Sequence, residues 1–406
     1  MQSLLRTRLP LFLAVFIDIF SFGLMYPLIV GMFHSGWVAQ VYSPAWRDIF
    51  LSLAFSLFPV GMFFGASLLG DLSDALGRRR TLMICMAGLA AGYGLMWGSV
   101  ELHLLWLFLA GRLLSGLMAG TGAIAQAAMM DSALPDQRAG AMAQVTLVNT
   151  VGFVAGPAIG GVLGHLDFRL PLGLALLLCL VTLITLWAAT FAGDVPKRKF
   201  EFDWREPFLL FWRMRSRPAL ISPVSAFFLF QFGYMVYYTF ILIEIQRRYG
   251  FTTAEIGLFS MVMGGGFVLG TSFGYKIAKQ LLGGDMPVAI VGLAVCGILV
   301  GLTALPLPAW AQVVLTLVIA TSNILAFVTL LAAIASAVAE TEQGWALGVG
   351  NASVALSVFA AGLLSSLLSI LPSAAFQVLG GVLILSAIVP TRRLMTMTGK
   401  KAVAAS

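Results

Sequence analysis

The chain alternates between long apolar runs and short polar segments along almost its whole length. Each run is long enough for a helix to cross a bilayer, which takes about 20 apolar residues. Because backbone groups in hydrocarbon must be satisfied within the segment, we expect each run to be helical. Twelve runs are expected, at about 9–33, 49–69, 81–100, 104–130, 139–163, 172–191, 219–244, 255–275, 287–305, 309–338, 344–369 and 373–390.

Lysine and arginine are concentrated in alternate polar segments. With both ends on one side, 19 of the 24 basic residues fall on that side and four on the other, and Arg112 lies within a span. Because cytoplasmic loops carry the excess of basic residues, both termini are predicted to be cytoplasmic. The first run is too long for a signal peptide and is interpreted as a retained helix.

The longest polar segment divides the chain into two halves. We predict an N-terminal half over 1–192, a cytoplasmic linker over 193–218, and a C-terminal half with a basic tail over 219–406. Phe208 to Trp212 beside arginines is typical of a short helix on the membrane surface, although an ordinary linker is equally compatible. Six spans on each side, with weak repeats between them, are typical of secondary transporters.

Composition excludes most other classes of protein. Hydrophobic residues make up 60% of the chain and charged residues 10%, far below the roughly 25% charge of soluble domains. The basic residues behind the net charge of +7 lie in short loops between apolar runs. This distribution is typical of membrane topology and not of a nucleic-acid-binding surface. The three cysteines are too far apart for a zinc motif, and no catalytic or phosphate-binding motif occurs. We therefore expect no enzyme activity, no metal and no cofactor.

Two ionisable residues lie deep within the expected spans. Asp18 is about nine residues into the first span, roughly 13 Å at 1.5 Å per residue, and Arg112 is similarly deep in the fourth. Ionisable groups at such depth are costly and are candidate functional residues. We expect each to be the partner of the other; a structural ion pair or a packing hydrogen bond is the alternative. Glu244, beside Arg247 and Arg248, is expected to form an exposed salt bridge.

Glycines recur at helical spacing in two neighbouring spans. In the fourth span Gly116 and Gly120 follow Arg112 on the same face. In the fifth span the sequence G-F-V-A-G-P-A-I-G-G begins at Gly152. Glycines four residues apart allow two membrane helices to approach closely, and Pro157 bends the segment.

The segment G-D-L-S-D-A-L-G-R-R-R, residues 70–80, resembles the signature between the second and third helices of the major facilitator superfamily. The basic residue often found after the aspartate is Ala75 here. This resemblance implies a twelve-helix, all-α membrane fold with two pseudo-symmetric halves. We predict a cytoplasmic gate formed by Gly70, Asp74, Gly77, Arg78, Asp131 and Arg138. Asp131 is expected to meet the arginines of this turn, where a gate contact and simple helix capping are equally compatible. Asp74 is expected to meet the N-terminus of the eleventh span near Gln343 and Gly344.

Three further motifs resemble the twelve-helix drug:proton antiporter branch. They are the glycine-rich fifth span, Arg112 with its two glycines, and the acidic residue with glycine and proline in the first span. The resemblance implies proton coupling through Asp18 and Arg112. It also implies an antiporter motif formed by Gly152, Gly156, Pro157, Gly160 and Gly161.

Aromatic and amide side chains are candidates for the wall of a substrate pocket. Three tyrosines of the seventh span share one face, and amides are scattered over several spans. Such a pocket suits lipophilic, aromatic or cationic compounds, although helix packing explains any single aromatic residue equally well. The candidates are Tyr26, Gln126, Asn149, Gln231, Tyr234, Tyr237, Tyr238, Asn323 and Asn351.

Together these features predict a proton-coupled antiporter that exports a small lipophilic or amphiphilic compound by alternating access. Its expected partners are a small-molecule substrate, protons and membrane lipid, with no nucleic acid, and it is expected to be a monomer. We expect a multi-pass protein of the cell membrane, the inner membrane in a bacterium. A proton symporter or facilitator that imports a metabolite is the alternative, followed by a transporter-like sensor.

Overall fold

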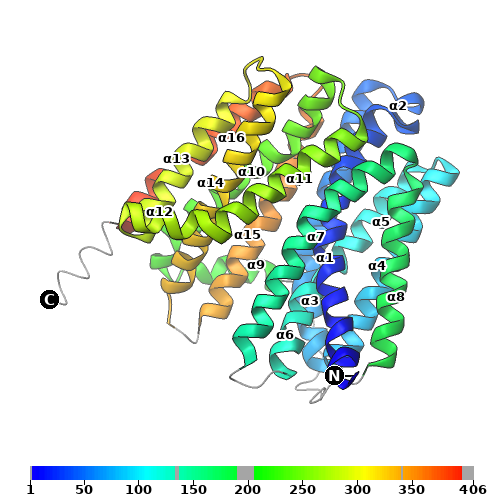
Figure 1. The fold of residues 1–406 in the computed structure, drawn as a ribbon, viewed down its shortest axis with the longest axis horizontal. Helices are drawn as coiled ribbons and strands as arrows, with labels where there is room; N and C mark the ends of the chain where they lie inside the picture. Colours follow the sequence, from blue (N-terminus) through cyan, green and yellow to red (C-terminus); the bar gives the residue numbers. More distant parts are fainter. Residues whose placement is uncertain (1, 133–136, 190–204, 340–341, 396–406) are drawn as a thin grey trace. The chain divides into compact units, whose positions relative to one another are not determined.

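The computed structural model describes residues 2–132, 137–189, 205–339 and 342–395, and within these ranges the chain is helical with no strand. Twelve helical segments of this described part are long and apolar enough to cross a membrane. The prediction of an all-α membrane protein with twelve spans is therefore confirmed (Figure 1).

The described helices belong to two compact units. The first unit comprises Met1–Trp204 with Phe251–Met261, and the second comprises Arg205–Gly250 with Val262–Ser406. Part of the predicted linker, 193–204, lies outside the described residues. A short helix, α9 (Glu206–Met214), occupies the region where a surface helix was expected, and it belongs to the second unit.

The first unit contains eight helices and the beginning of a ninth. They are α1 (Gln2–His34), α2 (Trp37–Val41), α3 (Pro44–Leu76), α4 (Arg78–Leu102), α5 (Leu105–Leu117), α6 (Thr121–Ser132), α7 (Arg138–Leu166) and α8 (Arg169–Ala188), with the start of α11 (Thr253–Leu269). The turn between α3 and α4 needs a positive φ, 91°, which Gly77 adopts without strain.

The second unit contains the remaining helices. They are α9, α10 (Pro218–Tyr249), the rest of α11, a π-helical turn (Gly270–Gly274), α12 (Tyr275–Leu282), α13 (Asp285–Leu302), α14 (Ala309–Ser336), α15 (Gln343–Leu364), a 3₁₀ turn (Ser365–Leu367) and α16 (Ser373–Ser386). Left-handed glycines, Gly250 and Gly283, end α10 and α12.

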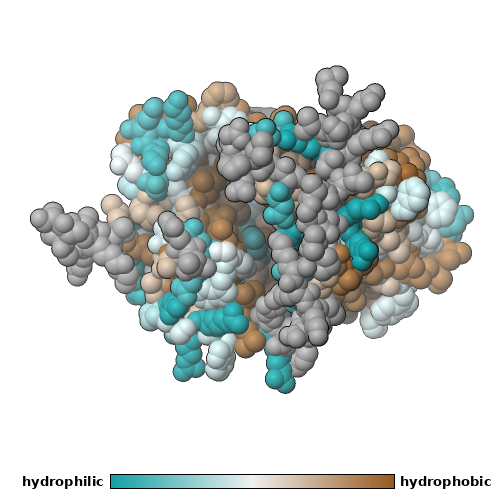
Figure 2. Space-filling model, turned by 90° about the horizontal axis from the view of Figure 1, so that it is seen from below, coloured by the Kyte–Doolittle hydropathy of each residue, from teal (hydrophilic) through white to brown (hydrophobic). Residues whose placement is uncertain are grey.

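Seen from below, Figure 2 shows hydrophilic side chains beside apolar ones. Arg79 is among the side chains that leave the α3–α4 turn, and its Nε donates to the carbonyl of Leu186 over 2.9 Å. A second bond from Arg79 reaches the carbonyl of Trp187. The guanidinium thus satisfies carbonyls at the C-terminus of α8, where a cation is also favoured by the helix dipole.

In the second unit an ion pair joins the beginnings of α10 and α15. Arg217 donates through Nη2 to Glu342 Oε1 over 2.5 Å and through Nε to Oε2 over 3.2 Å. This bidentate bond holds the pKa of Glu342 below its usual range. Both groups are at the ends of spans, so the bond links two helix termini outside the apolar core.

Close packing in the first unit depends on glycines where α7 lies along α1 (Figure 1). A Cβ atom at Gly160 would be 2.6 Å from the carbonyl oxygen of Leu24, and one at Gly156 would overlap the carbonyl oxygen of Phe20. At Gly152 the Phe16 carbonyl oxygen would be 3.2 Å away. Three successive turns of α7 therefore contact the backbone of α1, as the GxxxG spacing predicts.

A buried carboxylate holds one end of the second unit together. Glu244 of α10 is only 5% exposed; it pairs with Arg248 Nη2 over 2.6 Å and accepts a hydrogen bond from the Ser373 hydroxyl at the start of α16. Arg248 also donates to the Leu305 carbonyl over 2.8 Å. The pairing with Arg248 was expected, but the expectation of an exposed bridge is wrong, because α16 covers the carboxylate.

Gly156→Leu tests the packing of α7 on α1. The new side chain would meet backbone, which cannot move aside, so we expect destabilisation at or above the roughly 1–3 kcal/mol of overpacked cores. Gly94→Leu in α4 is the matched control, since a Cβ atom there meets nothing within 4 Å. Thermal unfolding in detergent compares the two, and equal melting temperatures would show that the contact is dispensable.

Glu244→Gln tests the buried carboxylate. The variant keeps the shape but leaves Arg248 without its counter-charge, so we expect a loss of about 1–3 kcal/mol in stability. Glu101→Gln, which alters an exposed pair with Arg169, should cost much less. The double variant Glu244→Gln/Arg248→Gln should recover part of the loss, because no charge is left unpaired. A double variant less stable than the single one would contradict this account.

Candidate functional site

The fourth span is broken near its middle. Helix α5 ends at Leu117 and α6 begins at Thr121, and the three residues between them form turns. The first N–H groups of a helix have no partner within it, so α6 begins with unpaired donors inside the membrane span Leu105–Asp131. In hydrocarbon such donors must be satisfied by another part of the protein.

Asp18 of α1 supplies that partner. Its Oδ2 atom accepts a hydrogen bond from the backbone N–H of Gly122 over 3.3 Å. A Cβ atom at Gly122 would lie 2.6 Å from the same oxygen, so only glycine allows this approach. The carboxylate also faces the positive end of the α6 dipole, which favours its charged form.

Glycines bring the two sides of the break close to α3. A Cβ atom at Gly116 would overlap the carbonyl oxygen of Phe58, and one at Gly61 would be 2.6 Å from the carbonyl oxygen of Leu113. Gly120 has more room, since its nearest neighbour would be Leu69 Cδ1 at 3.2 Å. The glycines of the fourth span therefore serve both the break and the packing on α3.

Arg112 lies in α5 with 3% of its surface exposed. Its Nε donates to the carbonyl oxygen of Ala54 in α3 over 2.9 Å, and its guanidinium lies 4.7 Å from the centre of the Phe58 ring. The arginine thus contacts a backbone carbonyl and an aromatic face, both of α3.

The expected ion pair between Asp18 and Arg112 is absent from the described structure. Asp18 is held by the start of α6, and Arg112 is held by α3. Each charged side chain is therefore bonded to polar backbone groups and not to the side chain of opposite charge. Sequence spacing could not show this, because a helix break creates partners that an unbroken helix lacks.

The charged turn between α3 and α4 brings several predicted gate residues together. Arg78 donates through Nη1 to the Ser73 hydroxyl over 2.8 Å and lies 3.6 Å from Asp74 Oδ1. Its Nε is 3.4 Å from Asp131 Oδ2, so the expected contact of Asp131 with the turn is present. Arg78 therefore joins the end of α3 to the end of α6.

Two predicted gate residues have other surroundings. Gly70 lies within α3, which continues to Leu76, and a Cβ atom there would meet nothing within 4 Å. The reversal is thus made at Gly77, after the end of α3. Arg138 is the first residue of α7, and its side chain lies outside the described part.

The glycine-rich motif of α7 also contacts the beginning of α11. A Cβ atom at Gly161 would lie 2.6 Å from Gly257 Cα, and one at Gly257 would lie 2.5 Å from the carbonyl oxygen of Pro157. The Pro157 ring packs on Gly23 of α1. Residues of the predicted antiporter motif therefore bind α7 to two helices of the first unit, α1 and α11.

The candidate substrate residues fall into both units. In the first unit Tyr26 of α1 is buried, with its ring 5.3 Å from that of Phe55, while Gln126 and Asn149 are partly exposed. In the second unit Tyr237 is fully buried and its hydroxyl bonds to Thr316 over 2.8 Å. Tyr238 is buried as well, and Asn351 is exposed.

Buried polar atoms without partners mark one part of the second unit. They are Gln231 Oε1 and Tyr234 Oη on α10 and Asn323 Nδ2 on α14, in residues that are each 3% exposed. Along α10 and α14 these three residues lie between two contacts, that of Phe227 with Phe327 and that of Tyr237 with Thr316. Unsatisfied buried groups cost about 1–3 kcal/mol each, so this polar patch is suited to a ligand or water that supplies the missing bonds.

The described residues contain no group of three or more histidine, cysteine, aspartate or glutamate side chains arranged for a metal ion. All three cysteines are buried and unpaired. Sequence reasoning missed the break in the fourth span and the role of the Gly122 amide. The signal was the run of glycines at 116, 120 and 122, interpreted only as a packing face.

Comparisons with known proteins agree with this architecture. A family model described as Major Facilitator Superfamily matches residues 11–362. The class D tetracycline resistance protein of Salmonella ordonez is 38% identical over 113 residues, 28% of each chain. The class C protein of Escherichia coli is 28% identical over 255 residues, 62% of this chain and 61% of that relative. These alignments thus span less than two thirds of the relatives' length.

Among solved structures, the human organic anion transporter MFSD10 has a TM-score of 0.67 at 21% identity. The match covers 95% of this chain and 99% of that one, and at this identity it shows the fold. The twelve spans and the family match over most of the chain lead to one conclusion. The chain is a multi-pass membrane protein that belongs to the major facilitator superfamily, a family of transporters and not of enzymes.

Proposed function

We propose that the protein is a proton-coupled antiporter that exports a small lipophilic or amphiphilic compound by alternating access. The observation that carries the proposal is the bond of the Asp18 carboxylate to the Gly122 amide, within the break of the fourth span. An acidic group at this depth is costly unless function retains it. Within the described residues its hydrogen-bond partner is the start of α6, and protonation of the carboxylate would weaken that bond.

Proton occupancy at Asp18 is thereby linked to the shape of the fourth span. A carboxylate accepts a stronger hydrogen bond than a neutral acid, by roughly a factor of two. Protonation therefore weakens the cap on α6, and deprotonation restores it. A proton binding equilibrium coupled to two arrangements of one helix is what an antiporter needs.

Arg112 contributes a fixed positive charge to the same span. Because it is tied to Ala54 and Phe58 of α3, it can hold α5 in place while α6 adjusts. In the proposed cycle, substrate binding from the cytoplasm favours proton release, and outward opening reloads the proton.

The orientation follows from the distribution of basic residues, with both termini in the cytoplasm. The α3–α4 turn with Arg78, Asp74 and Asp131 is then a cytoplasmic gate element. One charge crossing 100 mV is worth about 2.3 kcal/mol, which supports roughly a fiftyfold gradient before any pH difference.

The substrate class is inferred from two lines of support. Relatives named as tetracycline resistance proteins support a drug as the exported compound. The patch of Gln231, Tyr234 and Asn323 offers uncharged donors and acceptors beside aromatic rings. Such a surface suits a flat compound with hydroxyl or carbonyl groups.

Two other functions remain as alternatives, import by symport or facilitation and sensing without transport. Uptake into proteoliposomes under an imposed pH gradient separates all three. Export-type exchange requires substrate movement opposite to the proton, import requires movement with it, and a sensor moves nothing. A thermal-shift screen against drugs, organic anions, sugars and carboxylate siderophores narrows the substrate class independently.

Asp18→Asn should abolish uphill, proton-driven transport in proteoliposomes while leaving the protein folded. The amide oxygen can still accept from Gly122, but no proton can be released when substrate binds. Exchange of neutral substrates should survive, because it needs no titration, and cationic substrates should lose affinity. Asp285→Asn, which removes an exposed carboxylate paired with Lys279, is the control and should transport normally.

Gly122→Ala tests the same linkage without removing a titratable group. Its Cβ would displace the Asp18 carboxylate, so we expect impaired coupling and an altered pH profile of transport. Gly120→Ala is the matched control, because its Cβ would meet only a flexible leucine end. Full proton-driven efflux by Asp18→Asn would contradict the proposed mechanism. A wild-type pH dependence of transport in Gly122→Ala would show that the start of α6 takes no part in coupling.

A further inference from the structure

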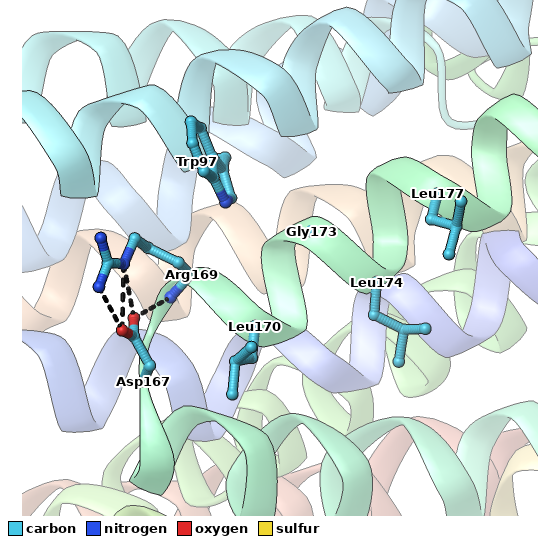
Figure 3. Close-up of a pocket in the computed structure, with 7 residues that line it drawn as sticks. All are labelled: Trp97, Asp167, Arg169, Leu170, Gly173, Leu174 and Leu177. Carbon is cyan, nitrogen blue, oxygen red and sulfur yellow. Dashed lines mark hydrogen bonds and ion pairs between the residues drawn. The ribbon is translucent and has the colours of Figure 1, made fainter.

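A groove opens on the surface of the first unit between α4 and α8. Its volume is about 430 Å³, and apolar side chains form its walls (Figure 3), namely Trp97, Leu170, Leu174 and Leu177 with Gly173 as its floor. Both helices are membrane spans, and Leu170 and Leu177 are about half exposed. The groove therefore faces lipid.

A cluster of three charges lies at one end of the groove. Arg169 binds Asp167 through Nη2 over 2.6 Å and through Nε over 3.0 Å, and it binds Glu101 Oε2 through Nη1 over 2.6 Å. Figure 3 shows Arg169 and Asp167 side by side at the mouth. These bonds hold the pKa of Asp167 below its usual range, so the rim carries two negative charges and one positive charge.

Both the positive and the negative groups of the rim can form further hydrogen bonds. A guanidinium has five N–H donors, and these pairs use three of them, so two N–H groups of Arg169 remain for an acceptor. All three side chains are partly exposed. An ammonium group can donate to the carboxylates while a phosphate accepts from the guanidinium.

The length of the groove matches one leaflet. From Arg169 to Leu177 the helix rises about 12 Å at 1.5 Å per residue, close to half of the roughly 30 Å hydrocarbon core. Trp97 lies about one turn of α4 below Glu101, at the depth typical of interfacial tryptophan. Its indole nitrogen points toward α8 near Gly173 in Figure 3, and the described part of the chain gives it no hydrogen-bond acceptor.

We propose that the α4–α8 groove is a binding site for a phospholipid whose headgroup carries a phosphate and a primary ammonium. One acyl chain lies along Leu170, Leu174 and Leu177, the phosphate meets Arg169, and the ammonium meets Glu101 and Asp167. The Trp97 N–H donates to an ester carbonyl of the same lipid.

The charges discriminate between headgroups. A quaternary ammonium has no N–H to donate, so phosphatidylcholine would add no hydrogen bond to the carboxylates, which would keep only those from Arg169. Phosphatidylglycerol has no cation and meets a rim of net negative charge. Phosphatidylethanolamine is the headgroup that satisfies both signs. This proposal concerns the lipid-facing surface and does not depend on the proposed transport function.

The test measures bound lipid on the purified full-length protein by native mass spectrometry, with phosphatidylethanolamine, phosphatidylcholine and phosphatidylglycerol as probes. We expect phosphatidylethanolamine to bind about tenfold more tightly than the other two, since one charge-assisted hydrogen bond is worth about that factor. Equal binding of the three lipids, or a preference for phosphatidylglycerol, would overturn the proposal.

Two pairs of variants locate the site. Gly173→Leu fills the groove, because a Cβ atom there already lies 3.7 Å from Trp97 Nε1, and it should remove the preference. Gly301→Leu in α13 of the second unit makes the same change at a glycine whose Cβ atom would meet nothing within 4 Å, and it should retain the preference. Glu101→Gln should reduce the preference about tenfold, whereas Asp285→Asn in the second unit should not. Unchanged binding by Gly173→Leu with an intact melting temperature would place the lipid elsewhere.

Discussion

Backbone groups within hydrocarbon must be hydrogen-bonded, and this constraint explains why the fourth span, the first span and the intramembrane charges depend on one another. The break after Leu117 leaves amides at the start of α6 without partners inside that helix. Asp18 satisfies one of them, and Arg112 of α5 donates to a carbonyl of α3. Both charged residues are thus held by backbone groups of neighbouring helices.

Most of the fold could be predicted from the sequence because its causes are local. Twelve apolar runs, the basic residues between them and the glycine spacing of α7 each follow from the cost of polar groups in lipid or from the contact distance between helices. The short turn at Gly77 follows in the same way, since its positive φ favours glycine.

The contacts of the charged residues were harder to predict because they depend on how the helices pack in three dimensions. Asp18 and Arg112 have similar depths, so pairing them was the simplest expectation, yet Asp18 bonds to the start of α6 and Arg112 bonds to the backbone of α3. Glu244 was assigned to an exposed pair because two arginines follow it, but the start of α16 covers it. The unpaired Gln231 and Asn323 atoms likewise depend on which helix faces which, and spacing within a single helix does not determine this.

Helix α11 belongs partly to each unit, since Phe251–Met261 groups with the first and the remainder with the second. Its first residues cover glycine surfaces of the first unit, where Thr253 packs on Gly31 and Gly257 packs on Gly161. A fragment cut at the linker would lack this cover and expose close-packed backbone to lipid. The two halves are therefore not interchangeable modules: a chimaera or split version of the protein keeps an intact N-terminal half only if it also carries the first third of the eighth span.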